Sequence, residues 1–225
     1  ISDLVGEFPE LQGIMGGYFA EAQGFDKEIA LAVSEHYLPT RIDSKTPKKP
    51  FSIALALTDK IDTLVGFFGI NQKPTSSKDP YALRRSALGI IKLLIDNNKE
   101  FKIKDLISYS ASLHKDQGFE LLNQEFQKEL SNFLMERLKY YMKEKKIRAD
   151  ITKASINSYG VNHMNKIYKK AVTLNNLIND PIGEDIITSY KRATNILDSE
   201  LKNSDYKLSN TTDPGIFKND YEKNL

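Results

Sequence analysis

Apolar residues recur at intervals of three and four along almost the whole chain, which is the spacing of one face of an α-helix. Valine, isoleucine and threonine nowhere alternate convincingly with polar residues, so the pattern predicts no β-strand. We therefore expect an all-α protein. After a glycine-rich opening of short helices, the predicted helices cover residues 27–38, 51–69, 81–96, 101–115, 119–146, 161–178 and 183–201.

The helices group into three predicted parts. Residues 1–110 form a first helical domain, 111–150 a long connecting helix, and 151–225 a partial second helical domain. The boundary near residue 150 is indicated by a change to small polar residues. The last stretch, from residue 202, is rich in Asn, Asp and Lys, and is either a flexible tail or the edge of a domain that continues. Because the chain starts at Ile1, we expect a fragment of a longer protein.

The helix over residues 51–69 is apolar nearly all round, yet it contains Asp59 and Asp62. A helix of this kind lies inside a domain. A buried carboxylate without a partner costs several kcal/mol (roughly), so each aspartate needs a cation, a metal ion or hydrogen-bond donors.

The helix over residues 81–96 offers a partner, because it begins with two adjacent arginines. Arg84 falls at the edge of the apolar stripe, whereas Arg85 lies on the polar face. We predict a structural ion pair from Arg84 to Asp59 or Asp62, and we expect Arg85 to reach solvent or a ligand.

A metal site is the alternative interpretation of the same aspartates. His36 lies on the apolar side of its helix, and Asp with His is a common set of metal ligands. The preferred interpretation of His36 is a hydrogen-bonded core histidine. His114 and His163 are isolated, and no histidine is followed by aspartate. We predict no bound metal.

Composition narrows the possible functions. The net charge of +2 shows no global basic bias, so any nucleic-acid site must come from local clusters. The absence of cysteine excludes disulfides and thiolate zinc sites and fits a reducing compartment. No apolar run is long enough to span a membrane, and no signal peptide is present. We expect a cytoplasmic protein with no membrane partner.

Four long blocks carry a resemblance to a known family. They read "EFPELQGIMGGYFA", "EHYLP", "ALALTDKIDTLVGFFGI" and "PTSSKDPYALRRSALGIIKLL". In this order they resemble the beta subunit of the bacterial heterotetrameric glycyl-tRNA synthetase over residues 1 to about 106. The similarity continues through "NFLMERLKYYMKE" and recovers at "YKRATNIL", which is similar to the opening of that subunit's helical anticodon-binding region. The family's subunit is far longer, so the chain would be an internal fragment.

The resemblance implies a fold and a set of partners. Residues 1–110 would be an HD-domain-like helical module, related to phosphohydrolases, in which Asp59 matches a metal-ligand position and His36 with Asp59 is a vestigial metal site. In the family this module holds tRNA and has no catalytic residue of its own. The partners would be tRNA-Gly and the separate alpha subunit in an alpha2beta2 tetramer. That alpha subunit uses ATP and Mg, and this fragment binds no cofactor.

Three local clusters are candidates for RNA binding, which needs Lys and Arg on phosphates beside aromatic side chains. The first flanks the loop before residue 81, the second ends the long helix with six basic residues and two interleaved tyrosines, and the third lies in "YKRATNIL". Each is also explained as an ordinary solvated surface. The candidate tRNA-binding residues are Lys73, Lys78, Arg85, Lys143, Lys146, Lys191, Arg192 and Asn195.

Three functions therefore remain in view. In the first, which the resemblance implies, the chain is a tRNA-positioning part of a glycine–tRNA ligase. It would support the ATP-dependent attachment of glycine to tRNA-Gly by the alpha–beta complex. One alternative is a metal-dependent phosphohydrolase that uses His36, Asp59 and Asp62. The other is a structural scaffold that only contacts the alpha subunit.

Overall fold

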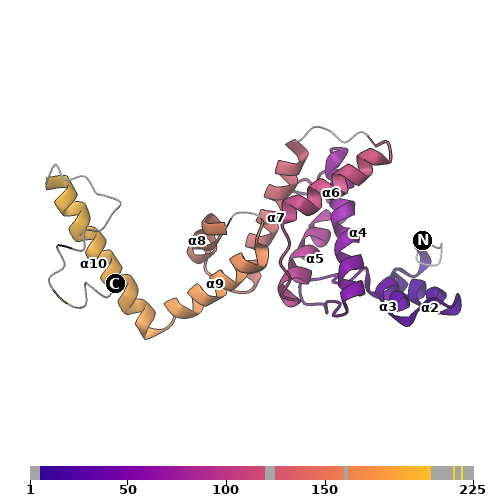
Figure 1. Ribbon diagram of the computed structural model, residues 1–225, viewed down its shortest axis with the longest axis horizontal. Helices are drawn as coiled ribbons and strands as arrows, with labels where there is room; N and C mark the ends of the chain where they lie inside the picture. The colour runs from indigo at the N-terminus through magenta and orange to yellow at the C-terminus, as the bar shows by residue number, and fades with distance from the viewer. Residues whose placement is uncertain (1–5, 120–124, 160–161, 204–214, 216–218, 220–225) are drawn as a thin grey trace. The chain divides into compact units, whose positions relative to one another are not determined.

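The computed structural model describes residues 6–119, 125–159 and 162–203, together with residues 215 and 219. Every regular element in these ranges is a helix, and they contain no β-strand, so the prediction of an all-α protein is confirmed. The elements are a short 3-10 helix at Pro9–Leu11, then α2 (Ile14–Ala22), α3 (Lys27–Glu35), α4 (Pro50–Gly69), α5 (Leu83–Asp96), α6 (Ile103–Asp116), α7 (Glu125–Glu144), α8 (Ala149–Tyr159), α9 (Met164–Ile178) and α10 (Pro181–Asn203) (Figure 1).

Local chemistry sets several helix ends. Asp26 caps α3 as predicted, because its carboxylate accepts a hydrogen bond from the Glu28 amide at 2.8 Å. Proline at the first position of α4 leaves no amide unsatisfied there. The C-terminal end of α7 is closed by Lys146, whose backbone is left-handed at φ 60°, and by a hydrogen bond from the Ile147 amide to the Met142 carbonyl.

The core lies between α4, α5, α6 and α7, which pack against one another (Figure 1). Each contributes side chains that are almost completely removed from water, such as Leu64, Ile91, Ile107 and Leu138, none more than 2 % exposed. Burial of this kind stabilises the fold by about 25 cal/mol for each Å² of apolar surface. The four helices therefore form a rigid support for residues at their ends.

Helices α2 and α3 form a close pair that adjoins α4. Gly17 permits the approach, since a Cβ atom at this position would lie 2.7 Å from the Ser34 Cβ and 3.0 Å from the Ala30 carbonyl oxygen. Gly13 precedes α2 with a φ of 82°, a conformation that side chains disfavour. The glycine-rich opening of the sequence is thus required by backbone contact.

The chain divides into two compact units, residues 1–175 and 176–225. Helix α8 and most of α9 belong to the first unit. There Tyr168 packs edge-on against Tyr141 with ring centroids 5.6 Å apart, and the Asn165 amide donates to the Asn98 side chain at 3.0 Å. The structural boundary thus falls about 25 residues beyond the composition change at residue 150. Most of residues 202–225, the predicted polar tail, lies outside the described residues.

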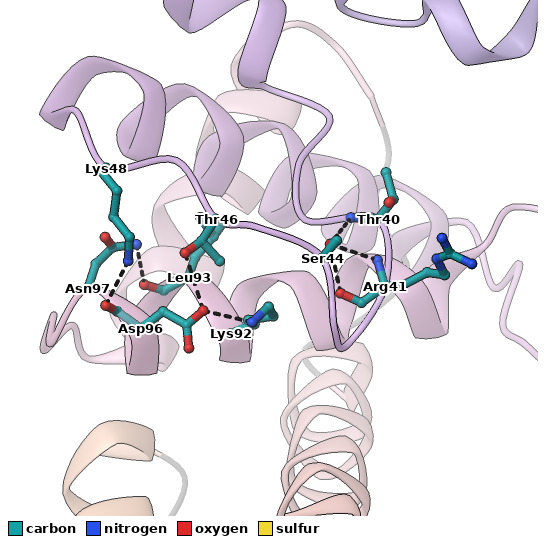
Figure 2. Close-up of polar contacts among 9 residues, drawn as sticks. All are labelled: Thr40, Arg41, Ser44, Thr46, Lys48, Lys92, Leu93, Asp96 and Asn97. Atoms are coloured by element: carbon teal, nitrogen blue, oxygen red, sulfur yellow. Dashed lines mark hydrogen bonds and ion pairs between the residues drawn. The ribbon is translucent and has the colours of Figure 1, made fainter.

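The loop between α3 and α4 is held at both ends (Figure 2). Near its start, the Ser44 hydroxyl accepts hydrogen bonds from the Thr40 and Arg41 amides at 3.0 and 3.1 Å. Near its end, Thr46 donates to the Asp96 carboxylate at 3.2 Å, and Lys48 donates to the Asp96 carbonyl oxygen. This loop therefore forms a fixed wall beside α5.

The same Asp96 carboxylate forms an ion pair with Lys92 at 2.7 Å (Figure 2). The helical pattern places Lys92 on a polar face with Arg85, but the structure buries Lys92 to 8 % exposure beneath the loop. The burial of Lys92 therefore depends on contact with a segment distant in sequence, which the helical pattern does not show. None of the described helices combines the length and apolar character needed to cross a bilayer.

Candidate nucleic-acid interface

Three neighbouring hollows in the first unit together form a basic track. The Lys60 pocket, about 650 Å³, lies between α2, residues 36–39, α4 and the start of α5. The loop hollow, about 610 Å³, lies between residues 39–43 and α5. The α7–α8 groove, about 830 Å³, lies between the end of α7 and α8. Arg85 lines both of the first two hollows and Tyr140 lines both of the last two, so neighbouring hollows share a lining residue.

The buried charge of α4 is Lys60, and not the aspartates on either side of it. Lys60 is only 4 % exposed, whereas Asp59 and Asp62 are both exposed. The expectation that these carboxylates face into protein is therefore wrong. Lys60 lies one turn from Ala56, Leu57 and Leu64, on the side of the helix that packs against the core.

The Lys60 amine is held by the backbone. Its Nζ atom donates a hydrogen bond to the His36 carbonyl oxygen at 2.9 Å. Burial lowers the pKa of Lys60 to about 8, although the nearby Asp59 carboxylate acts in the opposite direction. Lys60 thus lines the pocket with an amine that is still mostly protonated at pH 7.

The two adjacent arginines have different environments, as predicted, but the ion-pair partner of Arg84 is not the predicted one. Arg84 forms an ion pair with Asp79 at 3.8 Å and donates a hydrogen bond to the Thr75 carbonyl oxygen. The predicted ion pair from Arg84 to Asp59 or Asp62 is therefore wrong. Asp79 is nearer in sequence and sits in the turn before α5, where it also accepts hydrogen bonds from the first two amides of that helix.

Arg85 is exposed, as predicted, and points to the Lys60 pocket. Its Nη1 atom donates to the Tyr37 hydroxyl at 3.0 Å, and it forms no ion pair with any described carboxylate. Most of its five N–H groups remain available to a ligand.

Asp62 faces a different helix. Its carboxylate lies 2.9 Å from His114 Nε2 and 3.3 Å from the Ser110 hydroxyl, both on α6. It therefore couples α4 to α6 and does not line the Lys60 pocket.

The proposed metal ligands do not converge in the described residues. His36 and Asp59 both line the Lys60 pocket, but Asp62 faces away toward α6. The His36 Nδ1 atom lies 2.6 Å from the Val33 carbonyl oxygen, which matches a hydrogen-bonded histidine. Within the described ranges no three His, Asp or Glu side chains are grouped as a metal site would need.

The α7–α8 groove combines cations with an exposed aromatic ring. The Arg137 guanidinium lies 5.8 Å from the ring centroids of both Phe133 and Tyr140. Lys143 and Lys153 line the same groove and, like Arg137, form no ion pair with a described carboxylate. Tyr140 is 42 % exposed. Free cations beside an exposed ring suit the phosphates and bases of a nucleic acid.

The structure separates the other candidate RNA-binding residues. Lys73 forms an ion pair with Glu129 on α7, so its charge is already neutralised. Lys78 and Lys146 are exposed but line none of the three hollows. The remaining three, Lys191, Arg192 and Asn195, are exposed on α10, which belongs to the second unit. Arg85 and Lys143 are thus the two candidates that lie on the track.

Sequence reasoning missed Lys60, Arg137 and Lys153 as site residues. A signal existed for Lys60, because Ala56, Leu57 and Leu64, three or four positions away, are apolar. No signal existed for Lys153, since its place in the groove depends on how α8 turns back on α7.

Comparison with known proteins agrees with the resemblance in the sequence. The sequence profile of the family described as "Glycyl-tRNA synthetase beta subunit" matches residues 1–157. The chain is 38% identical over 224 residues to the glycine–tRNA ligase beta subunit of Cereibacter sphaeroides, which covers 100% of this chain and 32% of that protein.

Two further relatives carry the same name. The subunit of a Ruegeria species is 40% identical over 196 residues, covering 87% of this chain and 27% of that protein. The subunit of Rickettsia canadensis is 37% identical over 226 residues, covering 100% of this chain and 32% of that protein. The chain thus spans about a third of the length of the relatives it matches, and it belongs to the family of glycyl-tRNA synthetase beta subunits.

Proposed function

We propose that this chain is a tRNA-binding part of the glycyl-tRNA synthetase beta subunit. In the whole enzyme it supports the ATP-dependent attachment of glycine to tRNA-Gly. Glycine activation, with ATP and Mg, takes place on the separate alpha subunit of an alpha2beta2 complex. The first unit, an HD-like module in this proposal, contributes binding and orientation and no bond chemistry.

The observation that carries the proposal is the set of cations that line the two outer hollows of the track without forming an ion pair to a described carboxylate. Neighbouring hollows share Arg85 or Tyr140 as a lining residue. Phosphate groups of RNA follow one another along a strand, so a binding surface needs cations at intervals with aromatic contacts between them. The track has this composition despite a chain net charge of only +2.

The physical effect of such binding is positioning. A tRNA held by its backbone on a rigid helical support presents its end to the alpha-subunit active site in a fixed orientation, which lowers the entropic part of the barrier. The support is rigid because α5 and α7, which carry Arg85 and Tyr140, are packed on the core.

The test uses the intact enzyme that carries this chain. Arg85→Ala, and separately the double variant Lys143→Ala with Lys153→Ala, are compared with Lys115→Gln, an exposed lysine at the end of α6 outside the track. The affinity for tRNA-Gly is measured between about 50 mM and 200 mM salt. Each variant in the track should weaken binding and reduce the salt slope by about one for each lost phosphate contact.

Glycine-dependent adenylate formation without tRNA separates binding from damage to the complex. It should survive in all variants, because the track does not hold glycine or ATP in this proposal. If both track variants keep the tRNA affinity and the salt slope of the parent enzyme, the track does not bind tRNA. A scaffold that only contacts the alpha subunit would then be the better description.

A further inference from the structure

The Lys60 pocket contains a feature that a simple backbone-binding surface does not need. Lys60, a residue only 4 % exposed, lines this pocket, and the one hydrogen bond of its amine among the described residues goes to the His36 carbonyl oxygen. A buried cation without a carboxylate partner is costly, so a position of this kind suggests a ligand that supplies negative charge.

The fold makes room for this amine. The Lys60 side chain runs across Gly89 of α5, where a Cβ atom would lie 2.7 Å from Lys60 Cε and 2.9 Å from Cδ. Any side chain at position 89 would therefore displace the end of Lys60. The absence of a side chain there allows the amine to reach the pocket while its methylene stem stays between α4 and α5.

A second cation, Arg85, lines the same pocket. Arg85 is oriented by its hydrogen bond to the Tyr37 hydroxyl, and most of its N–H groups remain available. Both cations line one hollow of about 650 Å³, which is within the usual range for small-molecule sites, about 300–1,000 Å³. A phosphate group can accept hydrogen bonds from both.

Two exposed aromatic side chains also line the pocket, beside polar residues such as Gln12 and Thr63. Phe19 and Tyr81 line the pocket and are 47% and 44% exposed. Tyr81 is held in place by stacking on Phe67, with ring centroids 4.1 Å apart. An exposed ring that is already fixed loses little entropy when a base stacks on it.

We propose that the Lys60 pocket binds a single nucleotide, with its phosphate on Lys60 and Arg85 and its base against Phe19 or Tyr81. If the nucleotide is one unit of a bound RNA, this inference rests on the proposed function. The same chemistry fits a free mononucleotide, and the experiment separates the two sources. The exposed Asp59 carboxylate, which lines the pocket, is an acceptor for ribose hydroxyls.

The probes are 5′-AMP, adenosine and inorganic phosphate, titrated by calorimetry into the intact enzyme without ATP and into its variants. Because the alpha subunit provides a second nucleotide site, AMP binding is scored only as the part that depends on Lys60. Lys60→Met keeps the length of the side chain and removes the charge. Gly89→Ala leaves Lys60 in place but pushes its amine aside, so it tests the geometry independently. Lys115→Gln is the matched surface control.

We expect Lys60→Met and Gly89→Ala each to weaken AMP binding, tRNA-Gly binding or both by about tenfold, the loss of one charged hydrogen bond. If the Lys60-dependent binding of AMP competes with tRNA-Gly, the natural ligand of the pocket is a nucleotide of the bound RNA. If the Lys60-dependent binding of AMP does not compete with tRNA-Gly, the natural ligand is a free nucleotide. Adenosine and phosphate alone should each bind more weakly than AMP.

The inference is overturned if both variants are folded, as cooperative melting shows, and bind AMP and tRNA-Gly as the parent does. This outcome is distinct from failure of the proposed function. If the Lys143→Ala and Lys153→Ala double variant loses tRNA binding and Lys60→Met has no effect, the proposal that the track binds tRNA stands. Only the proposal of a nucleotide site in the Lys60 pocket then fails.

Discussion

The Lys60 Nζ atom donates a hydrogen bond to the His36 carbonyl oxygen across 2.9 Å, and so joins α4 to the segment that follows α3. Burial holds the pKa of this amine at about 8, below the ordinary 10.5. The folded state thus binds this proton more weakly than the unfolded state does. The destabilisation is complete below pH 8 and disappears as the pH rises through about 10.5.

Lys60→Met should therefore raise the free energy of unfolding at pH 7. One pKa unit corresponds to about 1.4 kcal/mol, and the lost hydrogen bond offsets about 1 kcal/mol, so a gain of about 2 kcal/mol is expected. Urea unfolding at pH 7 and pH 10 checks this, with Lys115→Met as control. The gain should shrink at pH 10. A loss of stability at pH 7 would show that the amine is solvated.

Asp96→Ala should destabilise the first unit by about 2 kcal/mol, because it leaves the buried Lys92 without its carboxylate. It also releases Thr46, so the loop between α3 and α4 loses an anchor (Figure 2). Limited proteolysis should then cut within residues 40–49 sooner than in the parent.

The control for Asp96→Ala is Glu136→Ala, which breaks the exposed ion pair with Lys139 and should change stability by less than about 0.5 kcal/mol. Equal stability of the two variants would mean that the Lys92–Asp96 pair contributes no more than a surface pair.

Asp79→Ala should cost about 1–2 kcal/mol, because the carboxylate accepts hydrogen bonds from the Leu83 and Arg84 amides at 2.9 and 3.0 Å. Thermal unfolding measures the loss. Asp43→Ala, which removes an ion pair with Arg41 that is exposed on both sides, should leave the melting temperature nearly unchanged. If Asp79→Ala also has no effect, Asp79 does not cap α5.

Tyr140→Ala should weaken the binding of single-stranded RNA to the intact enzyme by about 1–3 kcal/mol if bases stack on this ring. Tyr140→Phe keeps the ring and should bind as the parent does. Fluorescence anisotropy with a labelled oligonucleotide measures both. Comparable losses in the two variants would assign the effect to the hydroxyl group and not to stacking.

Part of the candidate site could be predicted from the helical pattern. The pattern correctly distinguishes Arg84 from Arg85, because adjacent helical positions point about 100° apart. It does not give the partner of Arg84, since the competing carboxylates at 59, 62 and 79 all lie in neighbouring segments. Arg84 pairs with Asp79, the nearest of them, in the turn before α5. The helical periodicity does not predict this partner.

The sequence by itself determined the helical class, the cap at Asp26, the exposure of Arg85 and the family, because these depend on local spacing and on long matching blocks. Only the tertiary structure decided which charge is buried and which cations share a surface. Lys60 reaches its pocket because Gly89 of another helix leaves space, and Tyr140 joins Arg85 because α5 and α7 pack together. Burial is set by what lies against a residue, and those contacts come from distant parts of the chain.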